Sequence, residues 1–406
     1  MHTPTHTSPG HAAGPAAASV FMRLLPLTLT VFIGFLTTGL QLPVLPLHVH
    51  GTLGMDELMV GIVVGAQFAA ALLSRAWAGN FADLRGTQRA VCLGLLFASS
   101  AGLVYLVSLS LLAHPIASLG LLIVGRVLLA LGESLLVTGT LGWGIGLVGP
   151  QNAGQVMAWI GTAIYGAFAV GAPLGVALNT RHGYAGLSVA VLLIPLLALG
   201  LIARMPALPP SAQRRTPFYK VLAAVSIPGM GLALCSTGLG MITTFIALLF
   251  AARQWGDASL AFTAFGASYI GARVLFSHLP DKIGGAKVAL LCVLVEALGQ
   301  LLIWKAPSAS SAYLGTALSG FGYSLAFPGF GVEAVRRAPP QARSLAMGAY
   351  VAFLDLSLGI SSPLAGALAK ACSVETVYLA GAVAVALSAL LALALMRTRV
   401  QAGAPV

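Results

Sequence analysis

Seven ionisable side chains fall within or at the ends of long apolar stretches of the sequence. Three of them, Asp355, Arg126 and Glu133, could bind protons or charged ligands. Asp355 stands between Leu354 and Leu356. A carboxyl group shielded from water in this way can take up a proton on one side of a barrier and release it on the other. Arg126 and Glu133 are seven residues apart, so on a helix they share one face at about 10 Å, too far for an ion pair. A permanent pair between Asp355 and an arginine across the bundle is the alternative to a proton-binding role.

Three uncharged polar side chains in apolar stretches could add hydrogen bonds to a ligand. They are Gln41, Tyr165 and Tyr323. Tyr323 is as far along the chain from Glu133 as Pro363 is from Pro173. Tyr323 and Glu133 therefore occupy equivalent positions in the two halves. The alternative is that these groups bond neighbouring helices, as polar residues in membrane spans commonly do.

The composition requires a membrane to surround the elements that hold these residues. Hydrophobic residues make up 58% of the 406-residue chain and charged residues only 8%, against about 25% charged in a soluble domain. In lipid the backbone must satisfy its own polar groups, so each long apolar segment predicts a spanning helix of about 20 residues. The sequence predicts an all-α polytopic protein with twelve transmembrane helices in two six-helix bundles. The expected spans are 20–47, 58–78, 90–112, 117–142, 154–178, 184–203, 221–250, 258–278, 286–305, 311–334, 343–369 and 374–396.

The segments between and beyond these spans divide the chain into five parts. A linker that contains Pro and Arg has no apolar stretch long enough to cross a membrane, so we expect it to lie in the cytoplasm. The expected parts are a disordered tail over 1–19, a bundle over 20–203, the linker over 204–220, a second bundle over 221–397 and a C-terminal tail over 398–406.

The two bundles are predicted to be copies of one unit. Four residues of the first half return in the second half, in the same order and at one constant offset: Arg75, Asp83, Gly86 and Arg89 correspond to Arg273, Asp281, Gly284 and Lys287. A repeated bundle of membrane helices is typical of transporters that rock two halves about a central site. Each arginine precedes its aspartate by about two helical turns and so lies about 12 Å deeper along the helix. The equivalent positions favour a role for Arg75 and Arg273 in gating.

The net charge of +11 is explained by membrane topology and not by nucleic acid. The basic residues are scattered over loops between helices and have no aromatic platform beside them. If the N-terminus is cytoplasmic, most loop Lys and Arg residues lie inside, and those outside are Arg181, Arg253, Lys305 and Lys370. This asymmetry predicts that both termini are cytoplasmic.

The sequence lacks the motifs of cofactor and metal chemistry. The four cysteines stand singly in separate apolar stretches. There is no phosphate-binding Gly-Lys-Ser/Thr loop, no His-Glu-x-x-His and no Gly-x-Ser-x-Gly elbow. We therefore expect no metal and no cofactor, with a proton gradient as the energy source. A remote alternative is an intramembrane enzyme that uses Glu133, His278 or Asp355 as acid and base.

The loop after the second span carries a recognisable turn. It reads Gly79-Asn-Phe-Ala-Asp83-Leu-Arg85-Gly86-Thr-Gln-Arg89 and resembles the signature turn of the major facilitator superfamily (MFS), although two commonly basic positions hold Leu84 and Thr87. The resemblance implies the MFS fold, with a central cavity lined by the first, fourth, seventh and tenth helices. It also implies that Asp83 meets the N-terminal end of the eleventh helix and helps to latch the outward-open state.

Two further motifs support the same resemblance. Arg126 followed by Gly132 resembles the Arg-containing motif of the superfamily, and Gly171-Ala172-Pro173-Leu174-Gly175 resembles its Gly/Pro motif with Ala172 interrupting it. The second motif is typical of antiporters, and close helix packing is the alternative explanation for its glycines.

The strings Leu73-Ser74-Arg75 and Asp355-Leu356-Ser357-Leu358-Gly359 are similar to those of YhhS-like bacterial MFS-type transporters. The resemblance implies a proton-coupled exporter of a small organic solute or drug that works as a monomer in the bacterial inner membrane. A proton-coupled symporter that imports a sugar or an organic acid is the alternative.

Overall fold

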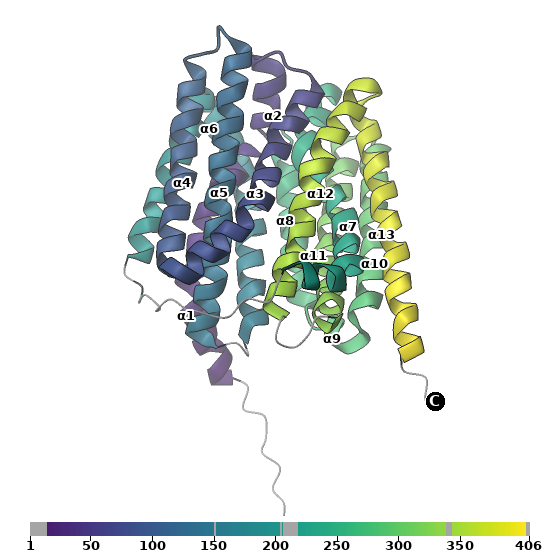
Figure 1. The fold of residues 1–406 in the computed structure, drawn as a ribbon. Helices are drawn as coiled ribbons and strands as arrows, with labels where there is room; N and C mark the ends of the chain where they lie inside the picture. Colours follow the sequence, from purple (N-terminus) through teal and green to yellow (C-terminus); the bar gives the residue numbers. More distant parts are fainter. Residues whose placement is uncertain (1–13, 150–151, 204, 206–217, 338–342, 403–406) are drawn as a thin grey trace, which may run out of the picture.

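The computed structural model describes residues 14–149, 152–203, 205, 218–337 and 343–402, and all regular structure in these residues is helical (Figure 1). The first half contains α1 (Gly14–Gln41), α2 (Leu45–Leu47), a π-helical turn η1 (His48–Thr52), α3 (Glu57–Arg85), α4 (Thr87–Leu109), α5 (Pro115–Val148) and α6 (Ala153–Ile202). The second half contains α7 (Phe218–Arg253), α8 (Ser259–Phe276), α9 (Leu279–Ile283), α10 (Gly285–Trp304), α11 (Ala309–Arg337), α12 (Arg343–Ala371) and α13 (Val374–Ala402).

Helix α6 contains two of the expected spans. Its 50 residues would extend for about 75 Å if straight, more than twice the thickness of a bilayer core of about 30 Å. Gly183 interrupts it with φ 64° and ψ −173°, which joins two helices across a kink. Ten helices of the described chain are long and apolar enough to cross a membrane, with α6 counted once and the Gly- and Ser-rich α11 not counted. Two spans in α6 together with α11 bring the number to the twelve that the sequence predicts.

The helices extend beyond several predicted boundaries. Helix α1 begins at Gly14 and α13 ends at Ala402, so residues 14–19 and 398–402 are helical although the sequence places them in tails. The first candidate membrane span, Met22–Thr52, consists of most of α1 together with α2 and η1, so it continues past the expected end at residue 47. The other residues of the two expected tails, and most of the expected linker, lie outside the described residues.

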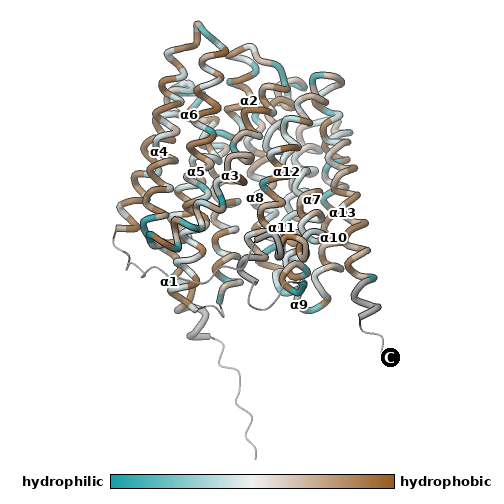
Figure 2. The backbone as a smooth tube through the Cα atoms, viewed as in Figure 1, coloured by the Kyte–Doolittle hydropathy of each residue, from teal (hydrophilic) through white to brown (hydrophobic). Residues whose placement is uncertain are grey.

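Apolar side chains cover the outer surface of the bundle. Figure 2 shows hydrophobic residues along the length of the helices. Large apolar side chains such as Leu73, Ile116, Leu197, Val274 and Leu364 are exposed by more than half. A surface of this kind is stable against lipid and not against water.

The repeated turn has one backbone geometry in both halves. Gly86 alone joins α3 to α4 with φ 96° and ψ 146°, and Gly284 joins α9 to α10 with φ 96° and ψ 140°. A positive φ of this size is accessible to glycine and strained for other residues. The chain reversal therefore depends on glycine at both equivalent positions.

The two halves meet through α3 against α12 and through α6 against α8. Helices α1 and α13 respectively begin and end at one end of the bundle, here called the terminal end, and α2 lies at the opposite, distal end (Figure 1). Near the distal end α3 and α12 touch so closely that a Cβ on Gly61 would collide with the carbonyl of Ser362, and a Cβ on Gly366 with the carbonyl of Glu57. Thr263 of α8 donates a hydrogen bond to the carbonyl of Ala169 in α6 at 2.8 Å.

Toward the terminal end α3 and α12 separate. Gly61 and Gly79 share one face of α3, and Gly366 and Gly348 share one face of α12, because each pair is separated by about five whole helical turns. A Cβ on Gly79 or on Gly348 would have no neighbour within 4 Å. The faces that touch at the distal end are thus apart at the terminal end.

Candidate functional site

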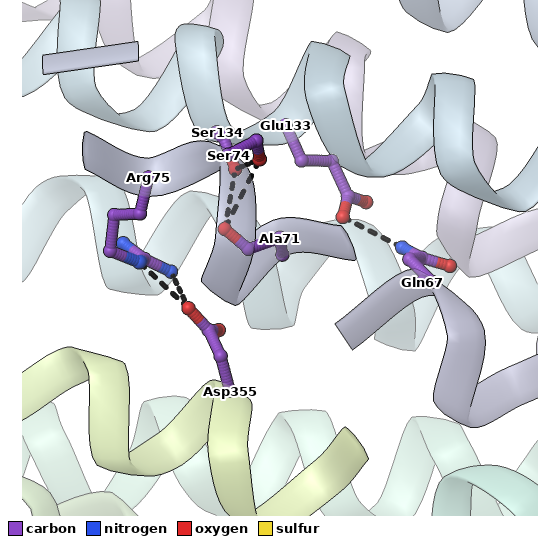
Figure 3. A network of polar contacts seen from close by, with 7 residues as sticks. All are labelled: Gln67, Ala71, Ser74, Arg75, Glu133, Ser134 and Asp355. Atoms are coloured by element: carbon purple, nitrogen blue, oxygen red, sulfur yellow. Dashed lines mark hydrogen bonds and ion pairs between the residues drawn. The ribbon is translucent and has the colours of Figure 1, made fainter. Parts of the chain in front are cut away.

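Arg75 and Asp355 form an ion pair between the halves (Figure 3). The Arg75 Nε donates to Asp355 Oδ2 at 2.7 Å, and Nη2 contacts the same oxygen. The Asp355 side chain is 6% exposed and that of Arg75 is 22% exposed. The sequence left two interpretations of Asp355, a proton-binding role and a pair with an arginine across the bundle. The structure contains such a pair, and the arginine is Arg75, which has Arg273 as its counterpart in the second half.

The pair lies where α3 and α12 begin to separate. One turn closer to the distal end, Gly359 packs on the backbone of Ala69, whereas Gly79, one turn further from it, has open space beside it. A hydrogen-bonded ion pair in a poorly hydrated place stabilises the contact only while both groups are charged. Loss of the charge on Asp355 would leave Arg75 without its partner.

Glu133 of α5 is held inside the first half. Thr38 of α1 donates to Glu133 Oε1 at 2.5 Å, and Gln67 of α3 donates to Oε2 at 2.7 Å. Both carboxyl oxygens therefore have a donor, and three helices meet at this group. The sequence singled out Glu133 and not Thr38 or Gln67, although Gln67 is a buried amide in an otherwise apolar part of α3.

Helix α3 connects the two carboxyl groups. Gln67 bonds Glu133, and Arg75, about two turns later, bonds Asp355. Between them Ser74 donates to the hydroxyl of Ser134 at 2.9 Å, which holds α3 against α5. Figure 3 shows Glu133 and Asp355 on opposite sides of α3. A movement of α3 would consequently change the surroundings of both carboxyl groups.

Arg126 and Gln41 lie together, apart from Glu133. The Arg126 side chain is 3% exposed, and its Nη1 donates to Gln41 Oε1 at 3.5 Å. As the seven-residue spacing predicts, no ion pair joins Arg126 to Glu133 in the part of the chain that the structure describes.

Tyr165 and Tyr323 belong to an aromatic cluster between the halves. Tyr165 of α6 packs on Tyr269 of α8 with ring centroids 4.0 Å apart, and Tyr323 of α11 is 6.0 Å from Tyr165. Arg273 lies over the Tyr269 ring at 5.0 Å and donates to the carbonyl of Ser324 at 3.1 Å. Sequence reasoning missed Tyr269, which stands one turn before Arg273.

The two contacts between halves are related by the repeat. The offset that matches Pro173 to Pro363 also matches Tyr165 to Asp355. Arg75 faces Asp355 on one side, whereas the equivalent Arg273 lies beside an aromatic cluster that includes Tyr165 on the other. One of the two equivalent contacts therefore contains a titratable carboxyl group and the other contains phenols.

The residues of the expected gating turn lie at the terminal end. Asp83 and Arg89 are exposed, and Gly86 makes the turn. The predicted latch is between Asp83 and the N-terminal end of α12, which begins at Arg343. The side chains of residues 343–345 lie outside the described part of the chain, so the latch stays a prediction. The side chain of Asp281 lies outside the described part as well, although its backbone belongs to α9.

Gly171 lies where α6 crosses α1, and Pro173 follows within the helix. A Cβ on Gly171 would be 2.8 Å from the carbonyl carbon of Gly39, and one on Gly175 would collide with the carbonyl of Leu40. The glycines of this motif therefore allow two helix backbones to touch, as in other tightly packed membrane helices.

The described residues do not assemble an enzyme-like centre. Glu133 and Asp355 have separate partners, and His278 precedes α9. No group of three or more His, Cys, Asp or Glu side chains in this part of the chain is placed to hold a metal ion.

The sequence model of the Major Facilitator Superfamily matches residues 27–228 and 228–405. The chain belongs to this superfamily. An uncharacterized MFS-type transporter of Salmonella typhimurium is 42% identical over 381 residues, which cover 93% of this chain and 98% of the relative. The MFS chain is thus a multi-pass membrane transport protein and not an enzyme.

Solved structures of transporters share its fold. A crystal structure of the nucleoside transporter NupG superposes with a TM-score of 0.74 at 16% identity and covers 92% of this chain and 99% of its own. A D-xylose–proton symporter superposes with a TM-score of 0.73 at 14% identity over 91% and 97% of the two chains. The YhhS-like assignment within the superfamily stays a prediction.

Proposed function

We propose that this MFS protein is a proton-coupled antiporter that exports a small organic solute by alternating access. The observation that carries the proposal is the Arg75–Asp355 pair, which places a titratable carboxyl group at the point where two halves separate. A proton that neutralises this carboxyl weakens the contact between α3 and α12. Proton binding and the movement of the halves are coupled in this way.

The basic residues of the loops support an orientation with both termini in the cytoplasm. In that orientation the terminal end faces the cytoplasm, and the described arrangement is closed toward the outside. A cytoplasmic solute would enter from the terminal end while Asp355 is ionised and paired with Arg75. Once the halves have reversed, Asp355 would take up a proton from the outside, because a neutral carboxyl group is buried at a lower cost than an unpaired carboxylate while the distal end closes. Release of this proton to the cytoplasm would then restore the ion pair with Arg75.

Glu133 is the second carboxyl group suited to this cycle. Its two donors, Thr38 and Gln67, come from α1 and α3, and the second of these helices also carries Arg75. A shift of α3 that breaks the Arg75–Asp355 pair would also remove a donor from Glu133. We therefore assign Asp355 the coupling proton and Glu133 a supporting role, with Arg126, Gln41, Tyr165 and Tyr323 as candidate contacts for the solute.

The relatives and the charge distribution support a location in the bacterial inner membrane. The Salmonella relative is bacterial, and the spans and loops are those of a multi-pass protein. The duplicated halves complete one alternating-access unit within a single chain, which is consistent with a working monomer.

Transport in proteoliposomes tests the proposal. Purified protein is reconstituted and supplied with labelled sugars, nucleosides, organic acids and cationic dyes under two opposed pH gradients. We expect a solute to move against the direction of proton flow. Uptake of a solute together with protons would instead establish the symporter, and the absence of any pH-driven flux across the panel would contradict proton coupling.

A further inference from the structure

A group of buried polar side chains near the distal end of the first half lacks hydrogen-bond partners. It consists of Arg126 on α5, Tyr105 on α4, Tyr184 in α6 and His48 at the start of η1, here called the Arg126 cluster. Each side chain is more than nine-tenths buried. The cluster lies inside one half of the protein and is separate from the Arg75–Asp355 contact.

The members of the cluster are packed against one another. The Tyr105 ring lies on Gly125, the neighbour of Arg126, so closely that a Cβ on that glycine would collide with it. The Tyr105 and Tyr184 rings are 6.4 Å apart and steeply inclined, and Tyr184 stacks on His48 at 4.0 Å with an angle of 8°. The Tyr105 hydroxyl interacts directly with the Arg126 guanidinium, and the Tyr184 hydroxyl lies within electrostatic range of it.

Four polar atoms of the cluster have no partner that meets hydrogen-bond geometry. They are Arg126 Nε, Tyr105 Oη, Tyr184 Oη and His48 Nε2. A guanidinium Nε can only donate, and a phenol hydroxyl or an imidazole nitrogen can also donate. A phenol oxygen that drew close enough to accept from Arg126 would still have its own hydrogen to donate. Only Arg126 Nε is restricted to donating, but the hydroxyl hydrogens of both phenols are also unused. We infer that these donors suit an acceptor that is not part of the protein.

The charge of Arg126 has no anion in contact with it. No carboxylate of the described residues lies within 4.0 Å of it, and the side chain donates to the neutral Gln41 at 3.5 Å. Glu133 interacts with Arg126 only at longer range. The oxygens of Glu133 are occupied by Thr38 and Gln67. By contrast Arg75 has Asp355. A buried cation is costly inside a membrane unless a negative group lies beside it.

We propose that the Arg126 cluster binds a single small anionic group, with Arg126 supplying the charge and the hydroxyls of Tyr105 and Tyr184 supplying directed hydrogen bonds. Water could accept the hydrogen bonds, but it would leave Arg126 without an anion in contact. Chloride and the carboxylate of a transported solute share the required chemistry. The inference does not require proton coupling, so it stands or falls independently of the antiport proposal.

Thermal unfolding of the purified full-length protein tests the site without a transport assay. The midpoint is measured in sodium chloride, in sodium acetate and in sodium gluconate, a bulky anion, at equal ionic strength. Saturating binding of a matching anion should raise the midpoint by about 3 °C or more over gluconate. A rise with chloride identifies a free halide, and a rise with acetate alone identifies a site for a carboxylate.

Matched variants assign the effect to the cluster. The double variant Tyr105→Phe/Tyr184→Phe keeps Arg126 and removes both hydroxyls, and it should lose most of the anion-dependent rise. Arg126→Gln should lose all of it. Tyr378→Phe is the control, because Tyr378 of α13 is also a fully buried phenol without a partner but lies in the other half. Anion dependence that is absent in the wild type, or unchanged in the Tyr105→Phe/Tyr184→Phe variant, would overturn the proposal.

Discussion

Asp355 accepts a 2.7 Å hydrogen bond from the Nε of Arg75 at the level of the membrane where α3 and α12 cease to touch. Closer to the distal end the two backbones are in contact at Gly61 and Gly366, and further from it Gly79 and Gly348 have open space beside them. The pair therefore lies at the inner limit of the distal contact between α3 and α12, where the two halves are closed against each other. Because the pair lies at this point, protonation of the Asp355 carboxyl group would weaken the contact that holds the two halves together.

Removal of one partner of this pair should cost more stability than removal of both. Arg75→Met leaves Asp355 buried without a counter-charge, and breaking a fully buried pair costs about 3 to 5 kcal/mol. Arg75 is 22% exposed, so we expect a smaller loss. The double variant Arg75→Met/Asp355→Leu should recover most of it. Thermal unfolding in detergent compares these two variants with the single variant Asp355→Leu, and a double variant less stable than either single one would contradict a direct interaction.

The close contact between α3 and α12 at the distal end should be sensitive to a single methyl group. Gly366→Ala places a Cβ against the carbonyl of Glu57, so we expect it to shift the protein toward arrangements open at the distal end. Gly348→Ala is the matched control, because it lies five turns away on the same helix face with nothing within 4 Å. Distances between spin labels on the distal ends of the two helices should lengthen only in Gly366→Ala.

The exposed contact between Asp56 and Lys370 should not set the pH dependence of transport. Lys370 Nζ donates to Asp56 Oδ2 at 2.7 Å, and this hydrogen bond and one from the Met59 backbone lower the pKa of Asp56 below its ordinary value, near 4. A lowered pKa means that the contact stabilises the closed end above about pH 4 and is lost as the pH falls through the lowered value. Asp56→Asn should leave the shape of a transport profile between pH 5 and 8 unchanged, and a profile displaced by a full pH unit would contradict this.

The signature turn should control how fast the protein switches between arrangements. Asp83→Asn removes the charge predicted to latch onto the N-terminal end of α12, so turnover should fall several-fold while solute affinity stays within about twofold. Initial rates at several solute concentrations separate the two quantities. Equal turnover in Asp83→Asn and the wild type would exclude the latch.

The sequence predicts those features that depend on spacing along one helix. The twelve spans follow from apolar runs, the equivalence of Arg75 and Arg273 follows from the repeat, and the absence of a pair between Arg126 and Glu133 follows from their separation by two turns. Each of these properties can be read from periodicity alone.

Contacts across the bundle could not be predicted in the same way. These contacts depend on how each helix is rotated about its axis and where it crosses its neighbours. They include the pairing of Asp355 with Arg75, the hydrogen bonds from Thr38 and Gln67 to Glu133, and the stacking of His48 on Tyr184. Gly-mediated crossings such as that of Gly171 over Gly39 set these rotations, and they involve residues far apart in the chain. The sequence also did not predict the π-helical turn that begins at His48, so it did not indicate where this side chain would lie.

The most direct test of the central claim compares pH-driven flux with solute exchange in proteoliposomes that contain Asp355→Asn. Exchange of labelled for unlabelled solute at equal pH requires alternating access but no net proton movement, whereas pH-driven flux requires a group that binds and releases a proton. We predict that Asp355→Asn retains exchange and loses at least about 90% of the pH-driven flux, because an amide cannot carry the proton. Undiminished pH-driven flux in this variant would show that the proton is carried elsewhere and would contradict the proposed coupling at the Arg75–Asp355 pair.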